Sequence, residues 1–169
     1  MTRRAVITQG EYLVSDDPEL SISTLLGSCV ACCLWDPERG VGGMNHMLLT
    51  RHRSSVQDFA GVNAMELLIN DLLKLGARRS HLRAKAFGGA KMVSGLSDIG
   101  AANGAFILSF LEAEAIPCMS QSLGGSAARQ LKFVPTTGAV KMKMQRNTID
   151  MDAETPPVVK PVGNGLELF

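Results

Sequence analysis

A cysteine and a histidine on either side of a predicted turn are the residues best suited to covalent chemistry in this sequence. Cys29 follows the tripeptide Leu-Gly-Ser, and His46 ends the run Val-Gly-Gly-Met-Asn-His. A thiolate is a strong nucleophile, but a free thiol is only slightly ionised at neutral pH and needs a base or a positive neighbour. An imidazole can act as that base. The pair therefore predicts nucleophilic attack on a carbonyl group, provided that the fold brings the two side chains together.

A β-hairpin is the element expected to bring them together. Residues 36–40 read Asp-Pro-Glu-Arg-Gly, which is typical of a turn between two strands. If Trp35 pairs with Val41, Cys29 and His46 are offset by one position, and a shift of one residue places them directly opposite each other. Directly opposed residues share a face, with Cβ atoms about 4.5 to 5.5 Å apart. We favour the shifted register because it brings the thiol within hydrogen-bond reach of the imidazole.

Nearby residues supply the remaining groups that such chemistry needs. Gly27 and Ser28 precede the cysteine in a predicted turn, where backbone N–H groups can face the oxyanion of an acyl-transfer intermediate. A third group should hold the imidazole in one tautomer. Ser23 and Thr24 on the preceding predicted strand offer the nearest hydroxyls, and general chemistry leaves both open.

The other cysteines and the basic run have simpler explanations. Cys32, Cys33 and Cys118 are expected to be small packing residues. The Cys29-x-x-Cys32 spacing also matches half of a zinc or redox site, but the sequence has no second pair and continues as a strand. The alternating basic run at residues 78–85 predicts a solvated strand face, or a surface that binds an acidic partner.

The elements around these residues indicate an α/β fold. Eight segments have the pattern of strands: residues 4–8, 20–25, 29–35, 41–49, 80–87, 118–123, 129–134 and 139–144. Helical spacing predicts helices at 62–75 and at about 100–115, the second with Asp98 as a candidate N-cap. Several connections are too short for crossover helices, so we expect mixed sheets with antiparallel pairs and helices covering the outer faces. Residues 145–169 contain three prolines and are expected to form a loose C-terminal tail outside a single domain at 1–144.

Composition narrows the function classes. The chain has 169 residues, 46% of them hydrophobic and 20% charged, which fits one globular domain. Its formal charge of +1 gives no general attraction to nucleic acid or to an anionic membrane. No apolar run approaches the roughly 20 residues of a membrane helix, and no apolar signal region follows Arg3 and Arg4. We expect a cytoplasmic protein with reduced cysteines, without membrane insertion.

Several segments together resemble the chemoreceptor glutamine deamidase family, CheD. They are Gly-Glu at 10–11, Leu-Gly-Ser-Cys-Val-Ala at 26–31, Trp-Asp-Pro at 35–37, Val-Gly-Gly-Met-Asn-His at 41–46, Phe-Gly-Gly-Ala at 87–90 and Gly-Ala-Val-Lys at 138–141. The resemblance implies Cys29 as the nucleophile and His46 as its base. It implies a hydroxyl six places before the cysteine, which is Ser23 here, with Thr24 as the neighbouring alternative.

The resemblance also implies a fold and partners. The family has a layered α/β sandwich related to bacterial toxin deamidases, acts on glutamines of methyl-accepting chemotaxis receptors and includes members that bind a CheC-type phosphatase. The implied reaction is deamidation through a thioester, with hydrolysis of glutamate methyl esters as a side activity and without a metal or organic cofactor. The alternative function is a non-catalytic adaptor that binds receptors or such a phosphatase.

Overall fold

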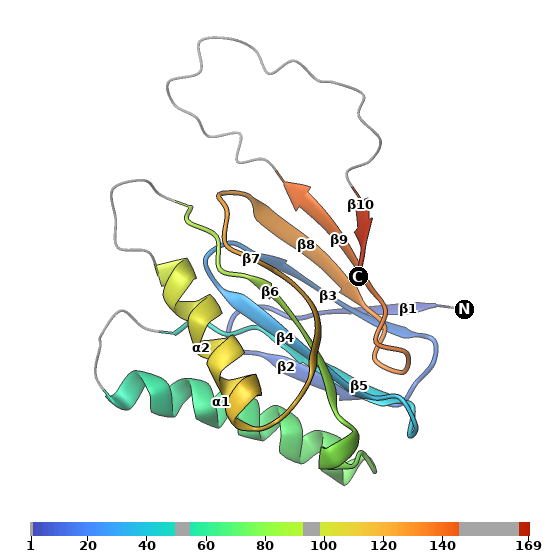
Figure 1. The fold of residues 1–169 in the computed structure, drawn as a ribbon. Helices are drawn as coiled ribbons and strands as arrows, with labels where there is room; N and C mark the ends of the chain where they lie inside the picture. The colour runs from blue at the N-terminus through green and yellow to red at the C-terminus, as the bar shows by residue number, and fades with distance from the viewer. Residues whose placement is uncertain (1, 50–54, 93–98, 146–165) are drawn as a thin grey trace.

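The computed structural model describes residues 2–49, 55–92, 99–145 and 166–169, which form a layered α/β domain (Figure 1). Ten strands are present in this part of the chain: β1 (Arg3–Val6), β2 (Tyr12–Ser15), β3 (Leu20–Leu26), β4 (Val30–Asp36), β5 (Val41–Asn45), β6 (Arg83–Gly88), β7 (Cys118–Leu123), β8 (Ala128–Phe133), β9 (Val140–Gln145) and β10 (Leu166–Leu168). The helices are α1 (Ser55–Lys74), α2 (Ile99–Ala113) and a short 3-10 turn, η1 (Arg79–His81).

The strands form two mixed sheets that pack face to face. Sheet A has the order β1-β3-β8-β9-β10, and sheet B has the order β2-β5-β4-β6-β7. Each sheet has one parallel pair at one edge, β1 with β3 and β6 with β7, and antiparallel pairs elsewhere. The predicted α/β layered sandwich with mixed sheets is therefore confirmed.

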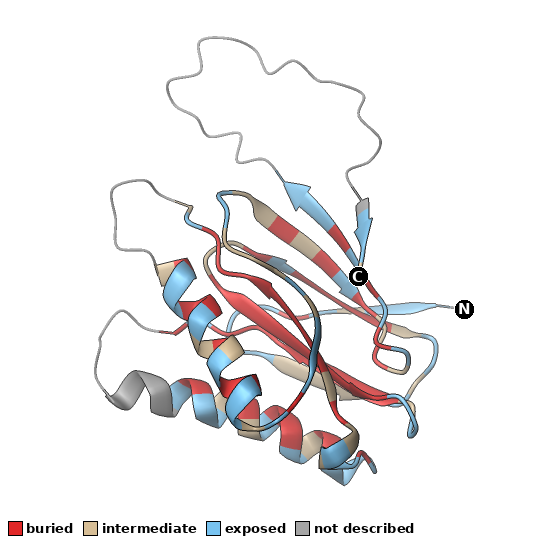
Figure 2. Ribbon diagram, in the orientation of Figure 1, coloured by how far each residue is buried: buried red, intermediate tan, exposed pale blue. Residues whose placement is uncertain are grey.

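Both helices pack on the outward face of sheet B, so the expected helical cover lies on one side of the sandwich. Apolar residues of α1 and α2, such as Leu68 and Ile107, are buried against alternate residues of β4 and β6. Figure 2 shows the central strands of sheet B buried between the helices and sheet A. Ala31, Cys33 and Trp35 of β4 face sheet A and form a second core with residues of sheet A: Ile22, Leu131 and Phe133. The outward face of sheet A carries no described helix.

The hairpin of β4 and β5 has a register that differs from the prediction. Asp36 pairs with Val41 and Cys33 pairs with Met44, so the strands are shifted beyond both of the registers considered from the sequence. The reason is that Asp36 belongs to the strand: its carboxylate accepts the N–H groups of Glu38 and Arg39, which closes the turn one residue later. Gly40 completes the turn with a φ of 63°.

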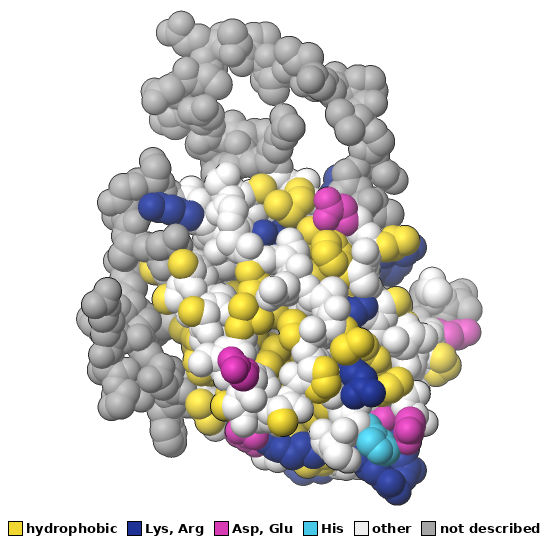
Figure 3. All heavy atoms as spheres, viewed as in Figure 1, with side chains coloured by type: hydrophobic (Ala, Val, Ile, Leu, Met, Phe, Trp, Pro, Cys, Tyr) yellow, Lys and Arg dark blue, Asp and Glu magenta, His cyan; other side chains and the backbone are white. Residues whose placement is uncertain are grey.

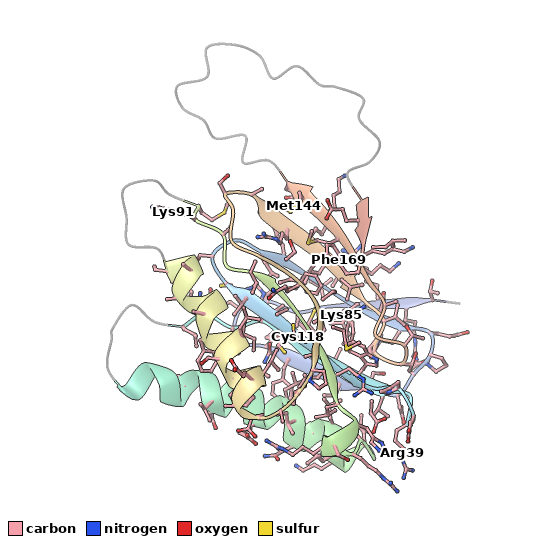
Figure 4. The ribbon with its side chains drawn as sticks, in the orientation of Figure 1. Arg39, Lys85, Lys91, Cys118, Met144 and Phe169 are labelled. Carbon is pink, nitrogen blue, oxygen red and sulfur yellow. The ribbon has the colours of Figure 1, made fainter. Side chains whose placement is uncertain are left out.

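Residues 166–169 join sheet A, which is the docking of the apolar end that the sequence left open beside the favoured frayed terminus; residues 146–165 of the expected tail lie outside the described residues. β10 pairs with β9, and Phe169 continues this pairing with Val140. The ring of Phe169 packs edge-to-face on the ring of Phe87. The Lys85 ammonium donates a hydrogen bond of 2.6 Å to the Phe169 carbonyl oxygen, and both residues are labelled in Figure 4. Lys85 is thus buried, and the predicted solvated basic face does not extend to it.

Smaller differences concern element ends. The sequence pattern missed β2, because Tyr12–Ser15 is a short strand of half-buried residues. The region expected as strand 80–87 begins as η1, and α1 begins at Ser55 instead of residue 62. Asp98, the candidate N-cap, lies outside the described residues. No helix in the described ranges is both long and apolar enough to cross a membrane.

Candidate active site

Cys29 lies in the connection that carries the chain from sheet A to sheet B. β3 ends at Leu26, β4 begins at Val30, and Cys29 joins the core between the two sheets with 9% of its surface exposed. Its thiol contacts the side-chain oxygen of Gln9, with 4.0 Å between Sγ and Oε1. Burial raises the pKa of the Cys29 thiol, because the thiolate loses hydration. The cysteine therefore rests as a neutral thiol and needs a base to ionise it.

His46 lies on the same face as Cys29, although not directly opposite it. Val30 pairs with Met47 through two backbone hydrogen bonds of 3.0 and 2.8 Å. His46 is therefore opposite Ala31, two residues from Cys29, and the pair is diagonal across the two chains. Diagonal neighbours have Cβ atoms about 7 to 8 Å apart or somewhat less, within reach of long side chains. The favoured register was wrong, but the two side chains share the space between the sheets.

A hydroxyl on sheet A determines the tautomer of His46. Thr24 Oγ1 lies 2.7 Å from His46 Nδ1 and also 2.7 Å from the carbonyl oxygen of Ile7. A carbonyl can only accept, so the single hydroxyl proton is donated to Ile7. The hydroxyl oxygen then accepts the Nδ1–H of the imidazole. Nε2 of neutral His46 is left with its lone pair, which is the form that a general base requires.

Ser23 does not occupy that position. It pairs with Val6 on one side and with Lys132 on the other, and its side chain lies on the outward face of sheet A. Successive residues of a strand point to opposite faces, so only one of Ser23 and Thr24 can reach the inner face. The structure brings Thr24 to His46, in place of the Ser23 that the resemblance implied.

The environment of His46 favours its neutral form. Burial lowers the pKa of the imidazole, and the negative charge of Glu11 opposes this shift. Glu11 accepts two hydrogen bonds from Thr8, one from the amide and one from the hydroxyl, and these lower the pKa of its carboxyl group. At neutral pH the site therefore holds an uncharged imidazole beside a carboxylate and an uncharged thiol.

Gln9 is a site residue that the sequence analysis missed. Glu11 N–H donates to the Thr8 carbonyl at 2.9 Å, and Gly10 has a φ of 86°, which together define a type II turn with Gln9 at its tip. The turn is held against His46, whose backbone bonds to both Gly10 and Glu11. A rigid turn thus presents the Gln9 carboxamide to the Cys29 thiol. The Gly-Glu at positions 10 and 11 is part of the family resemblance, but nothing in it singles out the glutamine that precedes it.

The loop before Cys29 is fixed through its carbonyl groups. The carbonyl oxygens of Gly27 and Cys29 accept hydrogen bonds from the backbone amides of Ala90 and Gly89, respectively. The carbonyl oxygen of Ser28 accepts a hydrogen bond of 2.7 Å from the side-chain amide of Asn103. Asn103 is fully buried on α2, and its own oxygen accepts the Leu49 amide at 3.2 Å. It therefore ties the cysteine loop to the segment after His46. The feature of the sequence that could have indicated this role is an asparagine, Asn103, within the largely apolar segment 99–111.

The cysteines of β4 do not converge. Cys32 faces the core under the helices, whereas Cys29 and Cys33 face the core between the sheets. Burial raises the pKa of Cys32 and Cys33, which disfavours the thiolate form that metals bind. Within the described ranges no three His, Cys, Asp or Glu residues are grouped as a metal site.

A pocket adjoins the site between α1 and the ends of β2 and β5. It has a volume of about 230 Å³ and is lined by His46, Glu11, Leu48 and Leu67, with further residues of α1 and β5. Leu48 and Leu67 are exposed large hydrophobic residues. The histidine therefore borders a partly apolar depression, whose lining does not include Cys29.

Comparison with known proteins finds a matching family model and relatives named as chemoreceptor glutamine deamidases. The family model described as CheD, chemotactic sensory transduction, matches residues 50–144. The probable chemoreceptor glutamine deamidase CheD of Caulobacter vibrioides is 47% identical over 96% of this chain and 91% of the relative. The protein of the same name from Agrobacterium fabrum is 45% identical over 99% and 97%, and CheD 1 of a Ruegeria species is 51% identical over 83% and 76%.

The solved structures that resemble the chain are more distant. The Neisseria meningitidis protein NMB0706, of the DUF152 family, has 11% identity and a TM-score of 0.47 over 74% of this chain and 63% of its own. The Bacillus licheniformis hypothetical protein YfiH has 15% identity and a TM-score of 0.43 over 68% and 49%.

Proposed function

The chain belongs to the CheD family of chemoreceptor glutamine deamidases, and we propose that it deamidates receptor glutamines through a thioester on Cys29. The reaction hydrolyses a side-chain carboxamide to a carboxylate, so the protein is an amidohydrolase acting in chemotaxis. The observation that carries the proposed mechanism is the hydrogen bond from His46 Nδ1–H to Thr24, which leaves Nε2 free on the face that also holds the thiol.

Formation of the thioester begins with proton transfer from the Cys29 thiol to His46 Nε2. The thiolate attacks the carboxamide carbon of the receptor glutamine, and the C–N bond breaks as His46 returns the proton to the leaving ammonia. Thr24 accepts the Nδ1–H throughout, so the imidazole keeps its orientation whether it is neutral or charged. A side-chain rotation of the thiol from Gln9 toward His46 accompanies substrate binding in this proposal.

Backbone amides of the cysteine loop are the proposed oxyanion donors. The carbonyls of Gly27 and Ser28 point to Ala90 and Asn103, so the N–H groups of Ser28 and Cys29, in the same trans peptides, point the opposite way. Gly27 contributes by its missing side chain, since a Cβ there would lie 3.2 Å from Met92. A half-turn of the Gln9 amide would add its Nε2–H as a third donor.

Hydrolysis of the thioester completes the cycle. His46 Nε2 takes a proton from water, the hydroxide attacks the thioester carbon, and the sulfur leaves and recovers the proton as a thiol. The receptor gains a glutamate and therefore a negative charge. A glutamate methyl ester fits the same steps with methanol as the leaving group, and we propose this methylesterase side activity, which the resemblance also implies.

The test uses a receptor cytoplasmic fragment and follows its intact mass. The wild-type protein is expected to add the mass of one amide-to-acid conversion per modified glutamine. Cys29→Ala should abolish this gain, and His46→Ala should slow it strongly. Trapping with hydroxylamine should yield a glutamyl hydroxamate only when Cys29 is present, because hydroxylamine intercepts an acyl intermediate.

The outcomes separate the enzyme from the adaptor alternative. Binding of the fragment without any mass change in the wild-type protein would favour an adaptor, and equal rates in either variant would exclude the proposed pair. A CheC-type phosphatase partner and a cytoplasmic location remain predictions from the resemblance and the sequence. Co-elution with a purified phosphatase of that type tests the first.

A further inference from the structure

The outward face of sheet A carries a cluster of cations around a small pocket. The pocket has a volume of about 190 Å³ and includes Ser23 and Gln130 together with four basic residues: Arg4, Lys132, Lys141 and Lys143. All four are exposed, and they come from β1, β8 and β9. We call this surface the basic face. Its basic side chains cover Ser23, which explains why an outward-facing serine is only 3% exposed.

The basic face has a cross-strand pair that weakens the fold. Lys132 and Lys141 are directly opposite in the antiparallel pairing of β8 and β9, and Lys143 is the next outward residue along β9. Like charges directly opposite each other on one face are destabilising. The pair lies on β8 and β9, which are inside sheet A and not at its edges.

No carboxylate within the described strands of sheet A balances these charges. The one acidic residue in those strands is Glu167, which pairs with the buried Met142 and so points to the opposite face. The whole chain has a formal charge of only +1, so the cations are concentrated locally. The face of the molecule in Figure 3 differs, since acidic and basic side chains both occur there and hydrophobic side chains gather over α2.

Exposed hydrophobic residues flank the cations. In the row that contains Lys132 and Lys141, the outer positions are Val6, which is 61% exposed, and Leu168, which is 74% exposed. Leu25 lies beside Gln130 in the neighbouring row and is 54% exposed. Basic side chains bordered by aliphatic ones, without aromatic stacking residues, fit a protein surface better than a nucleic acid.

We propose that the basic face binds a carboxylate-rich segment of the receptor, next to the glutamine being processed. The inference rests on the proposed function, because each deamidation turns a neutral receptor side chain into a carboxylate and so increases the charge complementarity. β3 connects the two surfaces: Thr24 points inward to His46, Ser23 and Leu25 point outward, and Cys29 follows three residues after the strand. The enzyme thus binds its receptor more tightly as deamidation proceeds.

Binding measurements with two forms of the receptor fragment test this. The fragment is prepared with glutamate, or with glutamine, at all modified positions, and its affinity for Cys29→Ala protein is measured by calorimetry at low and high salt. The glutamate form should bind more tightly, with a difference that salt reduces. Adding Lys132→Gln, Lys141→Gln and Lys143→Gln should weaken its binding by about tenfold.

A matched variant neutralises three exposed cations outside sheet A: Arg39, Lys74 and Arg78. It should bind as the parent protein does. Turnover of a small glutamine peptide by the otherwise wild-type lysine variant should be unchanged, because that substrate does not reach the basic face. Failure of the wild-type protein to turn over any amide would defeat the proposed function itself, whereas equal receptor affinity of the two triple variants would defeat only this inference.

Two other occupants of the basic face are outcomes of the same test. Loss of binding to phosphatidylserine vesicles in the lysine variant, with receptor affinity unchanged, would assign the face to anionic headgroups and overturn the proposal. A gain in receptor affinity on neutralising Asp150, Asp152 and Glu154, with none lost in the lysine variant, would assign it to the chain's own acidic segment and overturn it as well.

Discussion

At the scale of single residues, the hydroxyl of Thr24 decides which nitrogen of His46 is the base. Its proton is committed to the Ile7 carbonyl, so the hydroxyl can only accept from Nδ1–H. Positioning of a reactive imidazole by a neighbouring hydrogen-bond acceptor resembles the role of the third residue in catalytic triads, although here the acceptor is uncharged. Thr24 itself therefore adds no negative charge that would stabilise the imidazolium, and the anion that favours the imidazolium is Glu11.

Substitution of Thr24 tests this assignment. Thr24→Val keeps the shape but removes the acceptor, and we expect kcat to fall by about ten- to a hundredfold, as for other groups that orient a reactive imidazole. Thr24→Ser should retain most activity. Ser23→Ala is the matched control and should leave turnover of a small glutamine peptide unchanged. The opposite result, with Ser23→Ala inactive and Thr24→Val active, would return the role to Ser23.

The pH dependence follows from the environment of His46. Burial lowers the pKa of the imidazole below its ordinary value of 6.5, so the neutral base persists at lower pH than usual. The rate should stay constant around neutrality and decline only below that value, as the base becomes protonated. Glu11→Gln removes the anion that favours the imidazolium, so the decline should move to still lower pH. The measurement is kcat/KM against pH, and a shift toward higher pH would contradict this account.

Gln9 is expected to act in the transition state. Gln9→Ala removes the proposed third oxyanion donor, and removal of one such donor typically lowers kcat by about 10²- to 10³-fold. KM should change little, because the oxyanion forms only after attack. Gln9→Glu keeps the length of the side chain but places a negative charge near the oxyanion, so it should be at least as impaired. Steady-state kinetics in which both variants match the wild-type kcat would remove Gln9 from the mechanism.

At the scale of elements, α2 supports the cysteine loop through Asn103. Asn103→Ala leaves the Ser28 carbonyl and the Leu49 amide without their partner, at a cost of roughly 1 to 3 kcal/mol for the buried Leu49 amide and less for the part-buried Ser28 carbonyl. We expect a lower free energy of unfolding and, at temperatures where the variant is folded, a lower kcat with an unchanged KM. Ser28→Ala keeps the carbonyl and should be near wild type. A kcat that Asn103→Ala leaves intact would limit Asn103 to a structural role.

The elements also show how far sequence reasoning reached. Alternation and turn residues predicted most strands and both helices. The prediction that Cys29 and His46 share a face was correct because the observed register differs from the favoured one by two residues, which leaves each side chain on the same face. The register was wrong because the carboxylate of Asp36 moves the turn by a side-chain contact that no spacing rule contains. The choice between Ser23 and Thr24 has the same difficulty, because an error of one position along a strand moves a side chain to the opposite face of the sheet. The sequence did not predict the roles of Gln9 and Asn103, because those roles depend on contacts with Cys29 and Ser28, which are distant from them in sequence.

At the scale of the whole molecule, the basic face opposes stability. Lys132→Glu turns the like-charge pair with Lys141 into an opposite-charge pair, and the free energy of unfolding should rise by roughly 0.2 to 1 kcal/mol. Receptor affinity should fall in the same variant, because one cation is replaced by an anion. Urea unfolding and calorimetry check the two quantities, with Lys132→Gln expected between the parent and Lys132→Glu in both. A Lys132→Glu protein with lower stability and undiminished affinity would contradict the account.

The reacting groups are distributed over the two layers of strands, with Thr24 on sheet A, His46 directly after β5 of sheet B and Cys29 in the crossing between them. Turnover therefore requires sheet A and sheet B to be packed against each other. A partly denatured form in which the two sheets have separated is expected to be inactive even if every strand is still formed. Enzyme activity measured during a denaturant titration therefore reports the packing of the two sheets. The activity should be lost no later than the circular dichroism signal of the strands.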